Sequence, residues 1–354
     1  MKKKILAAIF AGLMTFNLLS GVNDVQAASR AEIAAIKVTK PADFKYWADK
    51  SAGKRQIVNY VKDVTNKHSK NYIPVEDRIA VFDMDGTILC ETAPTSLGYM
   101  FVLDLMLENP DNPLYRDKLN EWKKILTSKN LPVEVDPEFK DLCWKMFAGM
   151  TDEEYFSRFE KFLTTQNVVG LTNLKYGESL YLPMIEVISY LNANDFTVYI
   201  ITGSERRTTR GIIGGVVPVQ PNHIIGCDIP YKWENNGGEK YFVKGDRFLI
   251  GDHRLGSNTR INKIYSIKRE IAKQPVIAFG NSSGDFDMLN YTLTNNKYKT
   301  AAFMVLCDDY TREIGNKTLE ETVRQASQKN GWTTISMKND FKTIYGDNVK
   351  LYKN

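Results

Sequence analysis

Short apolar runs alternate with helical patterns over the second half of the chain, and this alternation is the main guide to its fold. The runs are rich in β-branched and aromatic residues, as expected for buried strands, and the segments between them carry apolar residues at helical spacing. Such alternation predicts right-handed crossovers and a parallel sheet, so we expect an α/β protein with a Rossmann-like core. The predicted strands are 78–82, 196–201, 275–279 and 300–306, the predicted helices are 184–191, 205–213 and 261–272, and a hairpin is predicted within 223–250.

Two further segments have helical composition. Residues 28–77 are charged, with apolar positions at helical spacing, and predict an N-terminal helical extension packed on the main domain. Residues 93–180 are helical and rich in aromatic side chains, with no convincing alternating strand. These aromatic residues form the core of the segment itself or line a pocket, where their ring faces would suit a quaternary ammonium group.

The first residues have the pattern of a targeting segment. Three lysines precede an apolar run from Ile5 to about Leu19, and small residues surround Val25-Gln26-Ala27. This order predicts a secretory signal peptide over residues 1–27. A membrane anchor is the alternative, but the apolar run is short for a bilayer and is interrupted by polar residues. We therefore expect an exported protein, periplasmic or extracellular, without stable membrane insertion after cleavage.

The net charge depends strongly on this segment. The formal net charge is +5, and residues 1–27 hold three lysines and Asp24, a net +2, which leaves about +3 for the mature chain. A charge this close to neutral argues against nucleic acid as the main partner. The sequence does not fix the oligomeric state.

The four cysteines leave two possibilities open. An even number in an oxidising compartment allows one or two disulfides, and buried thiols are the alternative. Their wide spacing has no metal-ligand pattern. The cysteines are Cys90, Cys143, Cys227 and Cys307.

Three polar clusters follow predicted strands. They are Asp83-Met84-Asp85-Gly86-Thr87 after the first strand, Thr202-Gly203-Ser204 after the second and Gly280-Asn281-Ser282-Ser283-Gly284-Asp285 after the third. Each is weak alone, because such turns also cap helices or hold a metal–nucleotide. The carboxyl ends of parallel strands meet at one edge of a sheet, where ligands bind. We therefore expect the three clusters to form one site.

Together with Lys263, and in this order, the clusters resemble the four signature motifs of the haloacid dehalogenase superfamily. The resemblance covers about 78–92 and 181–307. It implies that Asp83 attacks phosphorus to form an aspartyl-phosphate, and that Asp85 protonates the leaving alcohol and later deprotonates water. It also implies Mg²⁺ as cofactor, with the metal held by Asp83, the backbone carbonyl of Asp85, Asp285 and the Asn281 position. The implied phosphate-binding groups are Thr202, Lys263 and the backbone N–H groups of Met84 and Gly203.

Three details refine this resemblance. An aspartate at position 85 is similar to the phosphatases and phosphomutases of the superfamily. The fourth motif usually begins with Gly-Asp, whereas this chain has a neutral residue, Asn281, which can bind a metal through its oxygen or orient a metal-bound water but adds no charge. Glu91 resembles the position from which phosphoserine phosphatases reach the substrate amine, although the spacing differs by one residue, and a surface or hinge glutamate is the alternative.

The resemblance also predicts the domain organisation. The core would comprise 78–92 and 181–354, and residues 93–180 would form a helical cap inserted after the first core strand. The expected function is an exported Mg²⁺-dependent phosphomonoesterase acting on a small phosphorylated metabolite, similar to phosphoserine or phosphorylcholine phosphatases. A phosphotransferase with the same residues and a non-catalytic phosphate-ester-binding protein are the alternatives.

Overall fold

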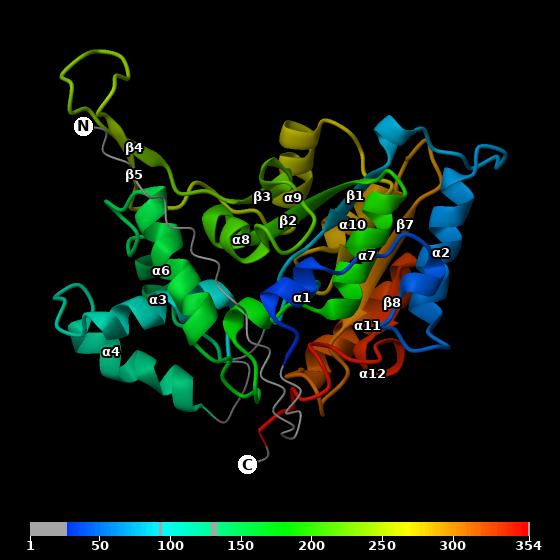
Figure 1. Ribbon diagram of the computed structural model, residues 1–354, viewed down its shortest axis with the longest axis horizontal. Helices are drawn as coiled ribbons and strands as arrows, with labels where there is room; N and C mark the ends of the chain where they lie inside the picture. The colour runs from blue at the N-terminus through cyan, green and yellow to red at the C-terminus, as the bar shows by residue number, and fades with distance from the viewer. Residues whose placement is uncertain (1–26, 92–93, 129–132, 353–354) are drawn as a thin grey trace, which may run out of the picture.

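The computed structural model describes residues 27–91, 94–128 and 133–352 (Figure 1). The predicted signal peptide therefore lies outside the described residues, apart from its last position. Across these three ranges, no helix combines the length and the apolar character needed to cross a membrane.

A six-stranded parallel sheet forms the centre of the molecule, with the strand order β3-β2-β1-β6-β7-β8 (Figure 1). The predicted α/β class and Rossmann-like core are confirmed. The central position of β1 places its carboxyl end between those of β2 and β6. The strands are β1 (Ile79–Phe82), β2 (Thr197–Glu205), β3 (Ile224–Cys227), β6 (Ile277–Gly280), β7 (Ala301–Leu306) and β8 (Thr333–Ser336).

Helices cover both faces of the sheet because alternate strand residues point to opposite sides. In β1, Ala80 and Phe82 join the hydrophobic core that includes α2 (Ala52–Thr65) and α7 (Leu182–Ala193). Ile79 and Val81 join the core on the other face, which includes residues of α10 (Phe286–Leu293) and α11 (Lys317–Asn330). Every residue of β1 is buried, which explains its continuous apolar sequence.

The segment between β1 and α7 is helical, and we call it the helical insert. Its α-helices are α3 (Leu97–Glu108), α4 (Arg116–Trp122), α5 (Pro137–Cys143) and α6 (Asp152–Thr165). The Phe101 ring packs against Phe147, Tyr155, Phe159 and Phe162 with centroid separations of 4.8–5.7 Å. These aromatic residues therefore form a core within the insert, as one of the two interpretations of the sequence expected.

The region predicted as one hairpin is divided between two sheets. Only β4 (Tyr231–Glu234) and β5 (Arg247–Ile250) form the antiparallel hairpin, which extends away from the body at the upper left of Figure 1. β3 instead pairs with β2 at the edge of the main sheet. The four residues of β3 are all buried, and so short an apolar run has no periodicity that separates it from the hairpin.

Other boundaries also differ from the predicted ones. β2 continues through Thr202-Gly203-Ser204, which were expected to form a turn. The helix predicted over 261–272 begins as α9 (Ile261–Ser266), continues as a π-helical turn (Ile267–Ile271) and ends at Ala272, where φ is +58°. The remaining helices are α1 (Arg30–Ala34), α8 (Arg206–Ile213), α12 (Met337–Asp340) and 3-10 turns at Pro41–Asp43, Val75–Asp77, Lys123–Thr127, Tyr176–Glu178 and Pro221–His223.

The four cysteines, all within the described ranges, form no disulfide with one another. Cys90, Cys143 and Cys227 are buried, and Cys307 is half-buried. This agrees with the second of the two possibilities left open by the sequence.

Candidate active site

A buried lysine between two aspartates forms the centre of the site. Asp83 follows β1 directly, and its backbone N–H donates to the carbonyl of Phe279 on β6 at 2.9 Å. Lys263 Nζ donates to Asp83 Oδ1 at 2.5 Å and to Asp285 Oδ1 at 2.6 Å. A third bond reaches the carbonyl of Ile201 on β2 at 2.7 Å. The lysine therefore joins β1, β2 and the turn after β6, and three of the predicted site residues meet.

Burial and the neighbouring charges change the pKa values of Asp83 and Lys263. Burial, and then the nearby Asp285, raises the pKa of Asp83 to about 8, although Lys263 opposes the shift. Burial alone would lower the pKa of Lys263, but the attraction of Asp285 and Asp83 outweighs it and raises that pKa above its usual value. The ammonium group therefore remains charged. Any further positive charge nearby would stabilise the ionised form of Asp83.

Asp85 lies beside the end of β2. Its Oδ2 accepts from the Ser204 hydroxyl at 2.6 Å and from the Thr202 hydroxyl at 3.4 Å. Its Oδ1 is buried and has no hydrogen-bond partner among the described residues. Burial raises the pKa of Asp85, against the opposing effect of Ser204. A buried carboxyl oxygen that lacks a partner is costly and is expected where a ligand or a proton is handled.

The end of β2 is irregular where it carries these hydroxyls. Its register with β3 shifts between Ile201 and Glu205, and such irregularities redirect side chains next to active sites. Asn258 Nδ2 donates to the carbonyls of Thr202 at 2.8 Å and Ile225 at 3.2 Å, which joins the two strand ends. A Cβ atom at Gly203 would lie 2.7 Å from Thr259 Cγ2, so glycine is needed for this close packing.

Asp285 organises the turn after β6. Its Oδ2 accepts from the backbone N–H groups of Asn281 at 3.0 Å and Ser282 at 3.1 Å, while its Oδ1 receives the lysine. One carboxylate oxygen of Asp285 therefore binds the turn, and the other binds Lys263. Asp285 thus fixes the geometry of the site whether or not it also binds a metal.

Glu91 and Asn281 meet above the turn that follows Asp85. Asn281 Nδ2 donates to Glu91 Oε2 at 2.7 Å, and the Thr87 hydroxyl donates to Asn281 Oδ1 at 3.5 Å. Burial of the carboxylate, then Asp85 and Asp83, raise the pKa of Glu91 to about 8. Glu91 is therefore part of the acidic site and not an isolated surface residue.

The donor set fits a divalent cation. The site gathers the carboxylates of Asp83, Asp85, Glu91 and Asp285, and Lys263 contacts the first and the last of them. Burial first, and then the neighbouring carboxylates, raise the pKa values of Asp83 and Glu91. Carboxylate, amide and carbonyl oxygens are the ligands that Mg²⁺ prefers. No three His, Cys, Asp or Glu side chains in the described ranges form a metal site by themselves. A Mg²⁺ ion would therefore need the Asp85 carbonyl or the Asn281 amide oxygen as well as Asp83.

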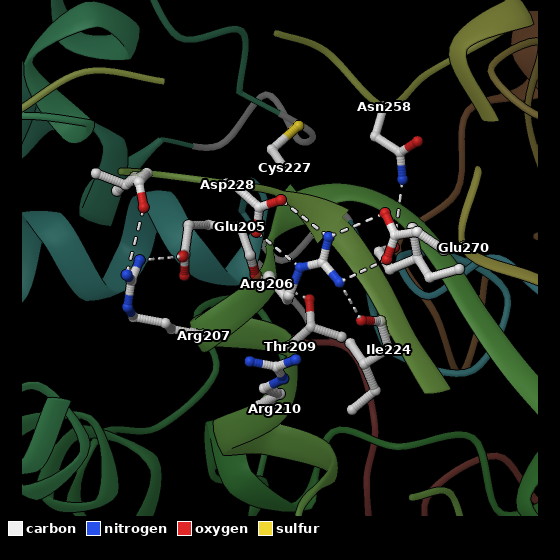
Figure 2. Close-up of polar contacts among 12 residues, drawn as sticks. Glu205, Arg206, Arg207, Thr209, Arg210, Ile224, Cys227, Asp228, Asn258 and Glu270 are labelled. Atoms are coloured by element: carbon white, nitrogen blue, oxygen red, sulfur yellow. Dashed lines mark hydrogen bonds and ion pairs between the residues drawn. The ribbon is translucent and has the colours of Figure 1, made fainter. Parts of the chain in front are cut away.

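An ion-pair network centred on Arg206 lies where β2 and β3 end (Figure 2). The Arg206 guanidinium pairs with Asp228 at 2.7 and 2.9 Å and with Glu270 at 2.9 and 3.2 Å, and it donates to the carbonyl of Ile224 at 3.0 Å. Because the pairing involves both sides of a planar guanidinium, it fixes β3 against the π-helical turn after α9. The sequence offered no signal for this network.

The neighbouring arginine ties the helical insert to the core. Arg207 pairs with Glu205 at 3.0 Å and with Asp152, at the start of α6, at 2.9 Å, and its guanidinium lies 4.4 Å from the centroid of the Tyr231 ring (Figure 2 shows Arg207 and Glu205). The Ile250 backbone also exchanges hydrogen bonds with the insert at residues 149 and 150. The insert is therefore held next to α8, which begins at the site.

Ser204 and Asn258 are the site residues that the sequence analysis did not single out for a role. Ser204 could have been found, because residues two apart on a strand share a face and Thr202 was already a candidate. Asn258 lies in an irregular segment with no pattern. The predicted roles of Met84 and Gly203 concern backbone N–H groups, and both residues lie at the same edge of the sheet as the carboxylates.

Several solved structures are similar to this one in fold. A crystal structure of a conserved, functionally unknown protein from Anaerococcus prevotii is 14% identical, with a TM-score of 0.51 over 82% of this chain and 92% of that one. A protein of unknown function from Bordetella pertussis is 16% identical, with a TM-score of 0.48 over 73% and 97%. A probable phosphoserine phosphatase from Vibrio cholerae is 11% identical, with a TM-score of 0.35 over 75% and 70%.

No curated protein sequence matches this chain. The family model of haloacid dehalogenase-like hydrolases matches residues 80–290, which include all four sequence motifs. Because this match spans more than half of the sequence, the chain belongs to the haloacid dehalogenase-like hydrolase family.

Proposed function

We propose that this protein is an exported, Mg²⁺-dependent phosphomonoesterase that passes the phosphoryl group through Asp83. The observation that carries the proposal is the buried contact of Lys263 with Asp83 and Asp285, beside an oxygen of Asp85 that has no hydrogen-bond partner in the described part of the chain. A carboxylate that attacks a phosphate dianion needs nearby positive charge, because the negative charges of the two groups otherwise repel each other. Lys263 supplies part of that charge at a fixed position.

Lys263, Asp83 and Asp85 each have a separate role in the proposed reaction. Lys263 holds Asp83 Oδ1 and so fixes the rotation of the nucleophilic carboxylate. Asp83 attacks phosphorus, the bond to the leaving oxygen breaks, and Asp85 gives that oxygen a proton. Asp85 then removes a proton from the water that hydrolyses the aspartyl-phosphate. Bound Mg²⁺ would supply the remaining positive charge for the phosphate.

The protonation of Asp85 suits this role. A general acid must keep its proton near the working pH, and burial raises the pKa of Asp85 toward that range. The Ser204 hydroxyl holds Oδ2, which leaves Oδ1 for the leaving oxygen. Thr202, by contrast, contacts Asp85 in this structure, and its contact with the phosphoryl group remains a prediction.

The substrate class is a small phosphorylated metabolite. The insert and the core border a cleft of about 430 Å³, lined by Tyr99, Trp144 and Arg254 among others. The Arg254 guanidinium lies 5.1 Å from the centroid of the Trp144 ring and so competes for the face that a quaternary ammonium group would need. The quaternary ammonium group of a phosphocholine-like substrate would therefore need a ring face other than that of Trp144.

A phosphate-release screen of the mature chain with Mg²⁺ tests the proposal. Phosphoserine, phosphocholine, phosphoethanolamine, nucleotides and sugar phosphates are the substrates to compare, with Asp83→Asn as the control. We expect release from at least one ester, and none from the variant or after chelation of the metal. Ester binding without release by the wild type would instead establish the non-catalytic alternative, for which the neutral Asn281 is the supporting observation.

Two further measurements complete the screen. Added alcohols that capture the phosphoryl group in preference to water would identify a phosphotransferase. Recovery of the protein outside the cytoplasm, with Ala28 as its first residue, would support the proposed export. Retention in the cytoplasm with residues 1–27 intact would contradict it.

A further inference from the structure

Glu91 determines which end of the Asn281 amide is available to a ligand. The Asn281 Nδ2–Glu91 Oε2 distance is 2.7 Å. Glu91 Oε2 accepts this hydrogen bond, so the NH₂ end of the amide faces the carboxyl group. Asn281 Oδ1 must then point elsewhere, and within the described ranges it accepts only a long hydrogen bond from the Thr87 hydroxyl, at 3.5 Å. The oxygen end of Asn281 is thus left for a cation.

Glu91 also restores a charge that the turn lacks. The resemblance to the superfamily leads one to expect an aspartate at position 281, and asparagine removes one negative charge there. Glu91 places a carboxylate within hydrogen-bonding distance of the same side chain. A bound cation would favour the ionised form of Glu91, and the pair of Glu91 and Asn281 would then carry the charge that a single aspartate would carry.

Gly86 provides the space for this pair. A Cβ atom at Gly86 would lie 1.9 Å from Asn281 Nδ2 and 2.6 Å from Glu91 Oε2. The φ of Gly86 is +73°, a conformation that favours glycine. Both side chains thus pack directly over the backbone of the turn that carries Asp85, which is the backbone expected to offer a carbonyl to the metal.

We propose that Glu91 is a positioning residue for the divalent cation, because it orients the Asn281 amide oxygen as a ligand and supplies the missing negative charge. This inference rests on the proposed function, since it requires a Mg²⁺ site at this edge of the sheet. It assigns Glu91 to the metal and not to the head group of the substrate. Groups that orient a metal ligand typically change metal affinity about 10- to 100-fold.

Titration calorimetry of the metal-free protein with Mg²⁺ tests this inference without any turnover. We expect Glu91→Gln to weaken Mg²⁺ binding by about 10- to 100-fold, because the charge is lost and the new amide can donate to Asn281 Oδ1. Glu76→Gln is the matched control, since Glu76 is an exposed glutamate away from the site, and it should bind Mg²⁺ as the wild type does.

The double variant Glu91→Gln/Asn281→Asp exchanges the two chemical groups. The amide introduced at position 91 can donate to the carboxylate introduced at position 281, so the pair keeps both its hydrogen bond and its charge. We expect Mg²⁺ affinity near that of the wild type. A purely structural role for Glu91 predicts no such recovery, and the double variant remains informative if the single variant folds poorly.

The outcomes separate this inference from the proposed function. If the wild type does not bind Mg²⁺, both fail. If the wild type binds Mg²⁺ and Glu91→Gln binds it equally well, only this inference fails. An increase in KM for an amine-bearing phosphate ester, with unchanged Mg²⁺ affinity, would assign Glu91 to the substrate and would also overturn it.

Discussion

Replacement of Lys263 by methionine should destabilise the protein more than the loss of any surface lysine. Lys263 is 1% exposed and contacts Asp83 and Asp285 at 2.5 and 2.6 Å. Removal of one partner from a buried ion pair leaves uncompensated charge and typically costs about 3–5 kcal/mol. Folded domains are stable by only about 5–15 kcal/mol, so the free energy of unfolding should fall by a large fraction.

The loss should depend on pH with a defined sign. Without the ammonium group, Asp83 and Asp285 repel each other, and protonation of Asp83 relieves the repulsion. The folded variant then binds protons that the unfolded chain releases, so its unfolding free energy falls as pH rises. The deficit relative to the wild type should be largest above about pH 8, where the pKa of Asp83 lies, and should shrink toward acid pH.

Urea unfolding of the metal-free proteins at two pH values measures this effect. The matched control is Lys62→Met, on the exposed side of α2, where methionine preserves helix propensity. The control should change stability by no more than about 0.5 kcal/mol. A loss for Lys263→Met as small as that of the control, or a deficit that grows on acidification, would refute the buried-charge argument.

Three further substitutions test the neighbouring residues. Asp85→Asn should lower kcat about 10²- to 10⁴-fold while substrate binding persists, and unchanged turnover would contradict the acid–base role. Ser204→Ala removes a hydrogen bond that lowers the pKa of Asp85, so the basic limb of the kcat/KM profile should move to higher pH; an unmoved or lowered limb would count against that contact. Gly86→Ala should lose more than the roughly 1–2 kcal/mol typical of a left-handed backbone, measured by urea unfolding, because the new Cβ would also meet Asn281 and Glu91, and it should weaken Mg²⁺ binding. Gly215→Ala, with φ +71° and open space around its Cβ position, should show only the backbone loss; equal behaviour of the two variants would argue against the packing over Gly86.

The sequence predicted the family and the strand ends at which the candidate residues lie. The family resemblance and the parallel sheet are confirmed by the family model and the strand order. Asp83, Lys263 and Asp285 could be placed together because each follows a strand or begins a helix at the same edge of the sheet. Their contacts at 2.5 and 2.6 Å are consistent with that expectation.

Other features depend on tertiary contacts that no local pattern encodes. β8 is four residues long, and half-buried positions in so short a segment do not reveal its pairing with β7. Asn258 lies in an irregular loop and acts only through its contacts with two strand ends. The sequence likewise did not indicate that Glu91 contacts Asn281, because the two residues are 190 positions apart.

The most direct test of the account is to trap the phosphoryl group on the enzyme. A rapid acid quench during turnover, followed by peptide mass spectrometry, should find one phosphoryl group on the peptide that contains Asp83. The modification should be absent in Asp83→Asn. Hydrolysis of the ester by an active Asp83→Asn variant, or turnover with the phosphoryl group on another residue, would contradict the central claim.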